Sequence, residues 1–318
     1  MQAKGMKSAL RIGFEDEFGT AQTTADKIVK MPFNANSLKS SQSLIKSETI
    51  TGTRNPVEPG NGQKECAGDI TVPLDARSIG YWLKAMFGAP ETAAVEGKEG
   101  FYKHTFKIKD EQPSLTIEKA FDDIKKYERF IGCKLSSMDF DAEVGNNETT
   151  VKMSFMGKDG GPSEESLNAK ATYKPLIRFD NINCTVKTDG ETLATARKLT
   201  TTINGGLDGD TFCLDGTASR TDIAEGIMAV SGTLTTLFTD LSMLNKAING
   251  TNISIEQIMK RGDYELSILI PQAKLERSSP EISGPKGITL ETNYEAFTDE
   301  GDANSVVVVK LTNDVAAY

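Results

Sequence analysis

The feature that most constrains this chain is a short motif that occurs twice. In the first copy Gly68 opens an alternating strand, and Asp75 stands where a short amphipathic helix would begin. Gly232 and Asp240 hold the same places in the second copy, and in both copies a glycine closes the helix at nearly the same spacing. Two long strands joined by a polar turn follow each copy. Because a duplicated β-rich unit can set related subdomains side by side in a ring, the pattern favours an assembly protein over an enzyme.

Charge and composition narrow the classes of partner. With 318 residues the chain has room for two ordinary domains, each with its own core. Its 36 basic and 45 acidic side chains give a net charge of −9. Tight binding to a phosphate backbone requires clustered Lys and Arg, so this balance argues against a nucleic-acid-binding surface. We expect the surface to repel nucleic acid.

The cysteines and the single histidine, His104, offer no familiar metal-ligand spacing. Cys66, Cys133, Cys184 and Cys213 lie far apart and form no C-x-x-C pair. We therefore predict reduced thiols, no metal site and no cofactor. No stretch is long and apolar enough for a signal peptide or a membrane helix, so we expect a protein made in the cytoplasm with no membrane span.

Turn-rich stretches divide the pattern of strands. We predict an N-terminal arm over residues 1–26, a first β domain over 27–160, a linker over 161–172 and a second β domain over 173–318. The arm carries one hydrophobic island, with Phe14 and Phe18, and must dock on something to be ordered. We expect the side chains of Phe14 and Phe18 to contact neighbouring subunits. Deletion of residues 1–26 should then leave soluble subunits that cannot polymerise.

Two hairpins have one polar face. Residues 133–144 alternate apolar side chains with Asp139, Asp141 and Glu143, and the returning strand alternates in the same way. A similar row recurs on residues 288–297. The polar candidates on these strands are Asp139, Asp141, Glu143, Thr150, Lys152, Ser154, Thr289, Glu291, Asn293 and Glu295. Neighbouring carboxylates can perform acid–base chemistry, but no nucleophile or histidine accompanies them, so we predict no catalytic residues and no enzyme.

Several segments, in order along most of the chain, resemble phage tail tube proteins, the major structural subunits of long-tailed bacteriophage tails. The N-terminal segment Ile12-Gly13-Phe14-Glu15-Asp16-Glu17-Phe18-Gly19-Thr20 is similar to that of the family. The later segments that resemble it are Ser114–Lys119, Ile131–Lys134, Val230–Thr235, Ile270–Leu275, Pro280–Gly284 and Val308–Asn313. The resemblance implies an all-β fold of two tandem β-sandwich units, each with one short helix, in which one sheet of each unit joins a continuous inner barrel.

The resemblance also implies a function. Closed rings would stack into a hollow tube, a tape-measure protein would occupy the lumen during assembly, and DNA would pass through it without specific binding. Tail terminator and initiator proteins would be further partners, and the protein would be a virion component assembled in the host cytoplasm. With two units per chain, three chains make a pseudo-sixfold ring, which we favour over a ring of six chains. A related tailocin or secretion-system tube stays open.

Within this tube hypothesis, the polar hairpin faces line a negatively charged lumen; the alternative is an ordinary solvated sheet face. The long loops 52–64 and 204–222 are candidates for contacts between rings, or else mobile surface loops. The loop candidates are Arg54, Asn55, Val57, Glu58, Asp208, Asp210 and Asp215. The alternative function is a β-sandwich adhesin or carbohydrate-binding module. Such a module usually exposes aromatic side chains on a sheet face, whereas the one tryptophan, Trp82, lies on a predicted helix.

Overall fold

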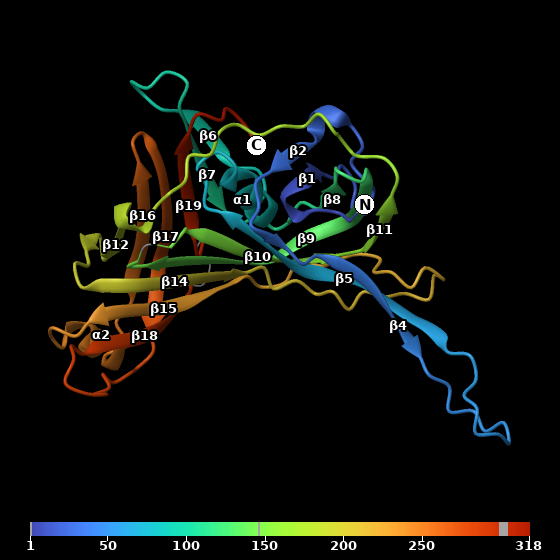
Figure 1. Ribbon diagram of the computed structural model, residues 1–318. Coiled ribbons are helices and arrows are strands. Elements are labelled where there is room, and N and C mark those ends of the chain that lie inside the picture. The colour runs from blue at the N-terminus through green and yellow to red at the C-terminus, as the bar shows by residue number, and fades with distance from the viewer. Residues whose placement is uncertain (1, 146, 299–304) are drawn as a thin grey trace.

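The computed structural model describes residues 2–145, 147–298 and 305–318 (Figure 1). Strands dominate, and the α-helices in these residues are two short ones, α1 (Ile79–Phe87) and α2 (Ser242–Ile248). The predicted all-β fold is confirmed. Single 3₁₀ turns are η1 (Gly5–Lys7), η2 (Ala25–Lys27) and η3 (Asn181–Asn183).

A first set of strands forms two layers that share one long strand, β9 (Lys126–Glu143). The N-terminal half of β9 belongs to an outer layer with the order β2–β1–β8–β9–β11, and its C-terminal half to a second layer with the order β4–β5–β10–β9. The other strands of this set are β1 (Ser8–Phe14), β2 (Val29–Met31), β3 (Ala35–Asn36), β4 (Lys39–Ile45), β5 (Gly60–Pro73), β8 (Leu115–Phe121), β10 (Thr150–Gly157) and β11 (Asp159–Ser163).

A second set of strands repeats this pairing, with β17 (Tyr264–Leu275) in the place of β9. The outer layer has the order β13–β12–β16–β17–β19, and the second layer has the order β14–β15–β18–β17. The other strands of this set are β12 (Cys184–Thr188), β13 (Glu191–Thr192), β14 (Ala196–Asn204), β15 (Ala229–Leu237), β16 (Ile253–Arg261), β18 (Thr289–Ala296) and β19 (Val308–Asn313).

The duplicated glycines occupy equivalent places in the two sets. A Cβ atom on Gly68 in β5 would lie 2.6 Å from the carbonyl oxygen of Ser37, and one on Gly232 in β15 would lie 1.9 Å from that of Thr200. Ser37 and Thr200 are equivalent residues of the two sets. Each lies two residues before the partner of the residue that precedes the glycine, because Lys39 pairs with Ala67 as Thr202 pairs with Ser231. Each glycine therefore lets the neighbouring strand approach its backbone more closely than a side chain would permit.

The two sets join in one sheet. β9 pairs with β14 in antiparallel register from Lys198↔Glu143 to Asn204↔Ser137, so that β4, β5, β10, β9, β14, β15 and β18 follow one another without a gap. Figure 1 shows these strands as a long band below the rest of the molecule. A hairpin of β6 (Glu91–Ala94) and β7 (Tyr102–Lys107) adds a second junction by pairing with β19.

The core lies between the apolar face of this joint sheet and the outer layers. Helix α1 covers part of the face, and its Trp82 ring meets Phe155 of β10 edge-on at 5.8 Å. The helix begins at Ile79 with Ser78 at its N-cap, three residues after Asp75, where we predicted its start. The carboxylate of Asp75 holds the turn that leads into the helix, accepting hydrogen bonds from the backbone of Arg77 (3.2 Å) and Ser78 (2.8 Å). Asp240 accepts the corresponding bond from the Ser242 backbone (2.8 Å).

Residues 1–26, which we predicted as an extended arm, include a strand of the outer layer. β1 lies between β2 and β8, and Leu10 and Ile12 are fully buried. The buried Arg11 guanidinium lies 3.0 Å from the carboxylate of Glu118, which is also buried. Arg11 hides the fact that β1 is buried on both faces, since a cation in a strand reads as solvent-facing until its buried partner is known.

Candidate assembly surface

The polar residues predicted from the two hairpins lie on a single face of the joint sheet. Lys152 of β10 is opposite Asp139 of β9, and Asp139 is opposite Thr202 of β14. The row continues through Ser231 of β15 to Glu295 of β18. Parallel rows pass through Asp141, Thr200, Thr233 and Asn293, and through Glu143, Lys198, Thr235 and Glu291; Ser154 and Thr150 of β10 and Thr289 of β18 lie at the ends of the same face.

Carboxylates outnumber ammonium groups on this face. Lys152 lies 2.9 Å from Asp69 of β5, and this hydrogen bond raises the pKa of Lys152 and lowers that of Asp69. Lys198 lies 3.2 Å from Glu143 and 3.9 Å from Asp141, and the bond to Glu143 raises the pKa of Lys198. Glu291, Glu295 and Asp139 have no ion pair of this kind among the described residues, so the face has an excess of negative charge.

Sequence reasoning missed the middle of this face. Thr200 and Thr202 of β14, and Thr233 and Thr235 of β15, alternate with the buried Leu199, Ile203 and Leu234. The alternation was present in the sequence, but threonine is common on either face of a sheet and gave no strong signal. The hydroxyl of Thr202 donates to Asp139 at 2.8 Å, which ties the two strand sets together across the junction.

Both ends of the joint sheet carry unpaired strand edges. At one end, the only strand of the described residues that pairs with β4 is β5, and residues 41–45 are exposed. At the other end, the chain continues beyond β17 along β18: the Glu276 N–H donates to the Asn293 carbonyl at 2.9 Å, and the hydroxyls of Ser278 and Thr292 lie 3.3 Å apart. Residues 279 and 281–287 are exposed. Unpaired edges of this length are templates for pairing with another chain.

The two long loops differ in their surroundings. Arg54, Asn55, Val57 and Glu58 lie in the connection between β4 and β5, which projects away from the molecule at the lower right of Figure 1. The second loop, residues 205–228, lies against the ends of β5, β9 and β10, and the predicted candidates Asp208, Asp210 and Asp215 are exposed on it. In the part of the chain that the structure describes, no three His, Cys, Asp or Glu side chains are grouped as metal ligands.

Phe14 and Phe18 contact their own chain. The ammonium of Lys84 lies 4.2 Å from the centre of the Phe14 ring, and those of Lys134 and Lys158 lie 5.5 and 5.7 Å from that of Phe18. The carboxylate of Glu15, which lies between these two residues in the sequence, accepts four hydrogen bonds, from the backbone N–H of Gly19 and Gly132 and the hydroxyls of Ser114 and Thr116. These bonds explain the fixed position of this segment.

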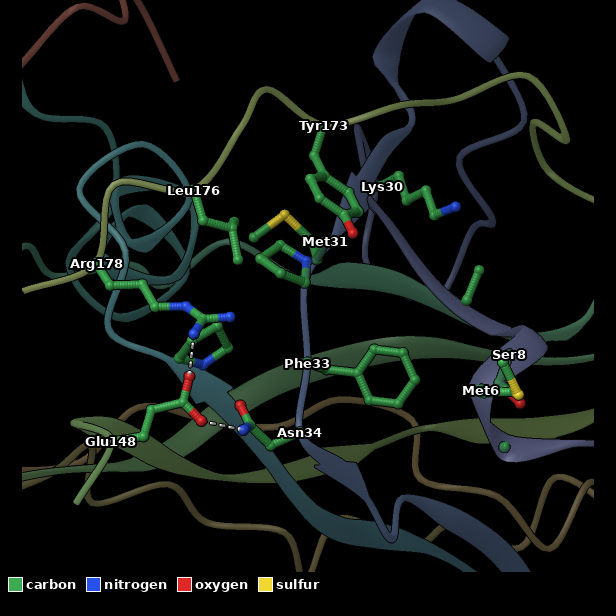
Figure 2. Close-up of a pocket in the computed structure, with 14 residues that line it drawn as sticks. Met6, Ser8, Lys30, Met31, Phe33, Asn34, Glu148, Tyr173, Leu176 and Arg178 are labelled. Carbon is green, nitrogen blue, oxygen red and sulfur yellow. Dashed lines mark hydrogen bonds and ion pairs between the residues drawn. The ribbon is translucent and has the colours of Figure 1, made fainter.

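A groove of about 620 Å³ opens near the turn between β9 and β10. Figure 2 shows Glu148 at one side of the groove, where its carboxylate accepts a hydrogen bond from Asn34 (2.9 Å) and lies 3.2 Å from the Arg178 guanidinium. Met31, Phe33 and Tyr173 also line the groove.

The single histidine, His104, lies outside this groove and is fully buried. Its ring hydrogen-bonds with the Thr92 hydroxyl (2.8 Å) and the Val315 carbonyl (2.8 Å), and burial lowers its pKa. Its bonds fit a packing role.

Among the helices of the described residues, none has the length and apolar character needed to cross a membrane. A model of the family described as phage tail tube protein matches residues 5–296. The comparison with curated proteins found no match.

Proposed function

The chain belongs to the phage tail tube protein family, and from this premise we propose that it closes into the rings of a tail tube by pairing the two free edges of its joint sheet. Membership in the family makes it a structural subunit of the virion tail, a class of protein that is not enzymatic. The observation that carries the proposal is the junction between β9 and β14. If the same kind of pairing forms between chains, it joins the free edge at β4 of one chain to the free edge that follows β17 in the next chain.

The repeat defines the register of that contact. β4 occupies the place of β14, and residues 276–283 occupy the place of the C-terminal part of β9, because Leu275 pairs with Tyr294 as Leu135 pairs with Phe155. Inside the chain Asn204 is opposite Ser137. Between chains this places Ser41 opposite Arg277, and Ser40 opposite Ser278. A head-to-tail contact of this kind produces a ring when its rotation closes, and closure removes both edges.

Three chains supply six repeats, so we propose a trimeric ring with pseudo-sixfold symmetry, and a ring of six chains is the alternative. Two tandem β-sandwich units are the repeats of this ring. The sequence-predicted division was 27–160, a linker over 161–172, and 173–318. Because β1 and β11 belong to the first strand set, we propose that the first unit extends over residues 8–163 and that the linker begins after it. The polar face becomes the lining of the lumen. Its surplus of carboxylates repels the phosphates of DNA, so the genome passes during ejection without adhering.

Stacking of rings brings opposite ends of the strands together. The connection between β4 and β5 extends from one end of β5, and the groove at Glu148 lies at the other end, near Pro73. We propose Arg54, Asn55 and Val57, with Asp208, Asp210 and Asp215, as residues that meet the next ring.

The proposal also includes the other partners of the tube. A tape-measure protein occupies the lumen during assembly, terminator and initiator proteins bind the tube ends, and assembly takes place in the host cytoplasm. A carbohydrate-binding module is less favoured, since Trp82 is fully buried and offers no sugar platform.

A disulfide across the proposed edge tests the ring directly. We would introduce Ser41→Cys and Arg277→Cys in one chain that also carries Cys213→Ser, because Cys213 is the exposed native thiol. Oxidation of assembled protein should produce a covalent species of three chains, measured by denaturing electrophoresis and mass spectrometry. Ser40→Cys with Arg277→Cys is the control, since neighbouring strand residues point to opposite faces and should not link. Species of six chains would support a hexamer, and a failure to link would contradict the edge pairing.

A further inference from the structure

Two connections of nearly equal length occupy equivalent places in the repeat but have different neighbours. Residues 205–228 link β14 to β15, and residues 42–64 link the corresponding positions of β4 and β5. The first connection is held against the first strand set: the Arg220 guanidinium lies 2.6 Å from Glu65, and the Lys64 N–H donates to the Ala218 carbonyl at 2.8 Å. The second projects into solvent, with residues 42–61 all exposed (Figure 1).

A lysine anchors the bound connection. Lys134 stands on β9 opposite Met156, and its ammonium lies 2.7 Å from both the Ile223 carbonyl and the Glu225 carboxylate. Phe18 lies beneath it at 5.5 Å. With the connection in place, Lys134 is only 7% exposed.

The second strand set has the same lysine without its partner. Lys274 stands on β17 opposite Glu295, in the place of Lys134, and lies 5.9 Å from the centre of the Phe297 ring. It is exposed, and no carboxylate within residues 2–145, 147–298 or 305–318 forms an ion pair with it. In the first strand set, residues 205–228 cover the start of β5 at Lys64. The equivalent position before β15 is Met228, and the adjacent Ile227 is 94% exposed.

We propose that residues 42–64 of one chain lie across the second strand set of the next chain in the same ring, and that Glu58 pairs with the Lys274 ammonium there. This inference rests on the proposed ring. Glu58 is the one acid between Glu48 and Glu65, and it lies close to Asn61, the position equivalent to Glu225. The connection also carries Ile50, which is 96% exposed, and it would cover Ile227 as it crosses. Glu58 then contacts a neighbour within the ring, in place of the contact between rings expected from the sequence.

A charge swap tests the pair. Lys274→Glu and Glu58→Lys should each weaken association of chains by about tenfold, because each leaves two like charges facing one another in a partly desolvated contact. The double variant Lys274→Glu with Glu58→Lys should restore association to within about twofold of the original protein. Glu48→Lys makes the same charge change on the same connection and should have little effect. Sedimentation velocity over a concentration series measures association, and circular dichroism verifies that each variant is folded.

The ring disulfide separates the two proposals. If Ser41→Cys and Arg277→Cys still link three chains while the double swap associates as weakly as the single variants, the Lys274–Glu58 contact is overturned and the ring stands. If Glu48→Lys weakens association as much as Glu58→Lys, the effect is one of overall charge, and the specific pair is likewise overturned. If the edges fail to link in the original background, the ring is contradicted and this contact with it.

Discussion

At the scale of single residues, the duplicated glycines make a sharp prediction about stability. A methyl group at Gly232 would lie 1.9 Å from the Thr200 carbonyl oxygen, and one at Gly68 would lie 2.6 Å from that of Ser37, where φ is also +151°. We expect Gly232→Ala and Gly68→Ala to lower the free energy of unfolding by about 2 kcal/mol or more, because a strand must move to accommodate the methyl group. Gly161→Ala in β11 is the matched control, since its methyl would meet nothing within 4 Å. Urea unfolding measures all three; equal midpoints would contradict the close approach.

At the scale of elements, strand β1 shows that the N-terminal segment is part of the first strand set. Deleting residues 1–26 removes the buried Leu10 and Ile12 and leaves the Glu118 carboxylate buried without Arg11. A buried charge that loses its partner costs about 3–5 kcal/mol, so we now expect the deletion to unfold the protein and not to leave soluble subunits. A deletion that ends at residue 4 should fold normally. Circular dichroism and solubility distinguish the two results; a folded, soluble 27–318 chain would contradict this role of β1.

The elements also show how far the sequence reached. Local alternation was sufficient for the β9–β10 hairpin and for β18, and helical spacing with an acid at the start was sufficient for α1 and α2. The polar candidates on those strands could be assigned to one face from the sequence, because successive side chains of a strand point to opposite faces. The family resemblance implied that one sheet of each unit joins a continuous barrel, but which strands meet was not predicted, because the pairing of β9 with β14 is a register between distant strands that no local pattern records. The burial of β1 on both faces was missed for the same reason, since the buried partner of Arg11 lies far along the chain.

At the scale of the whole molecule, the proposed tube predicts that its lining excludes DNA by charge. Glu291 and Glu295 lie exposed on the polar face, and Glu96 and Glu99 lie exposed on the turn between β6 and β7. Tubes of the variant Glu291→Lys with Glu295→Lys should retain short duplex DNA at low salt and release it as salt rises, because retention then depends on phosphate neutralisation. Tubes of the original protein should not retain it, and neither should Glu96→Lys with Glu99→Lys, which changes net charge equally. Co-sedimentation of tubes with labelled duplex at several salt concentrations is the measurement. Equal retention by both variants would mean that DNA adheres to the outside, and no retention by either would mean that the polar face does not meet the lumen.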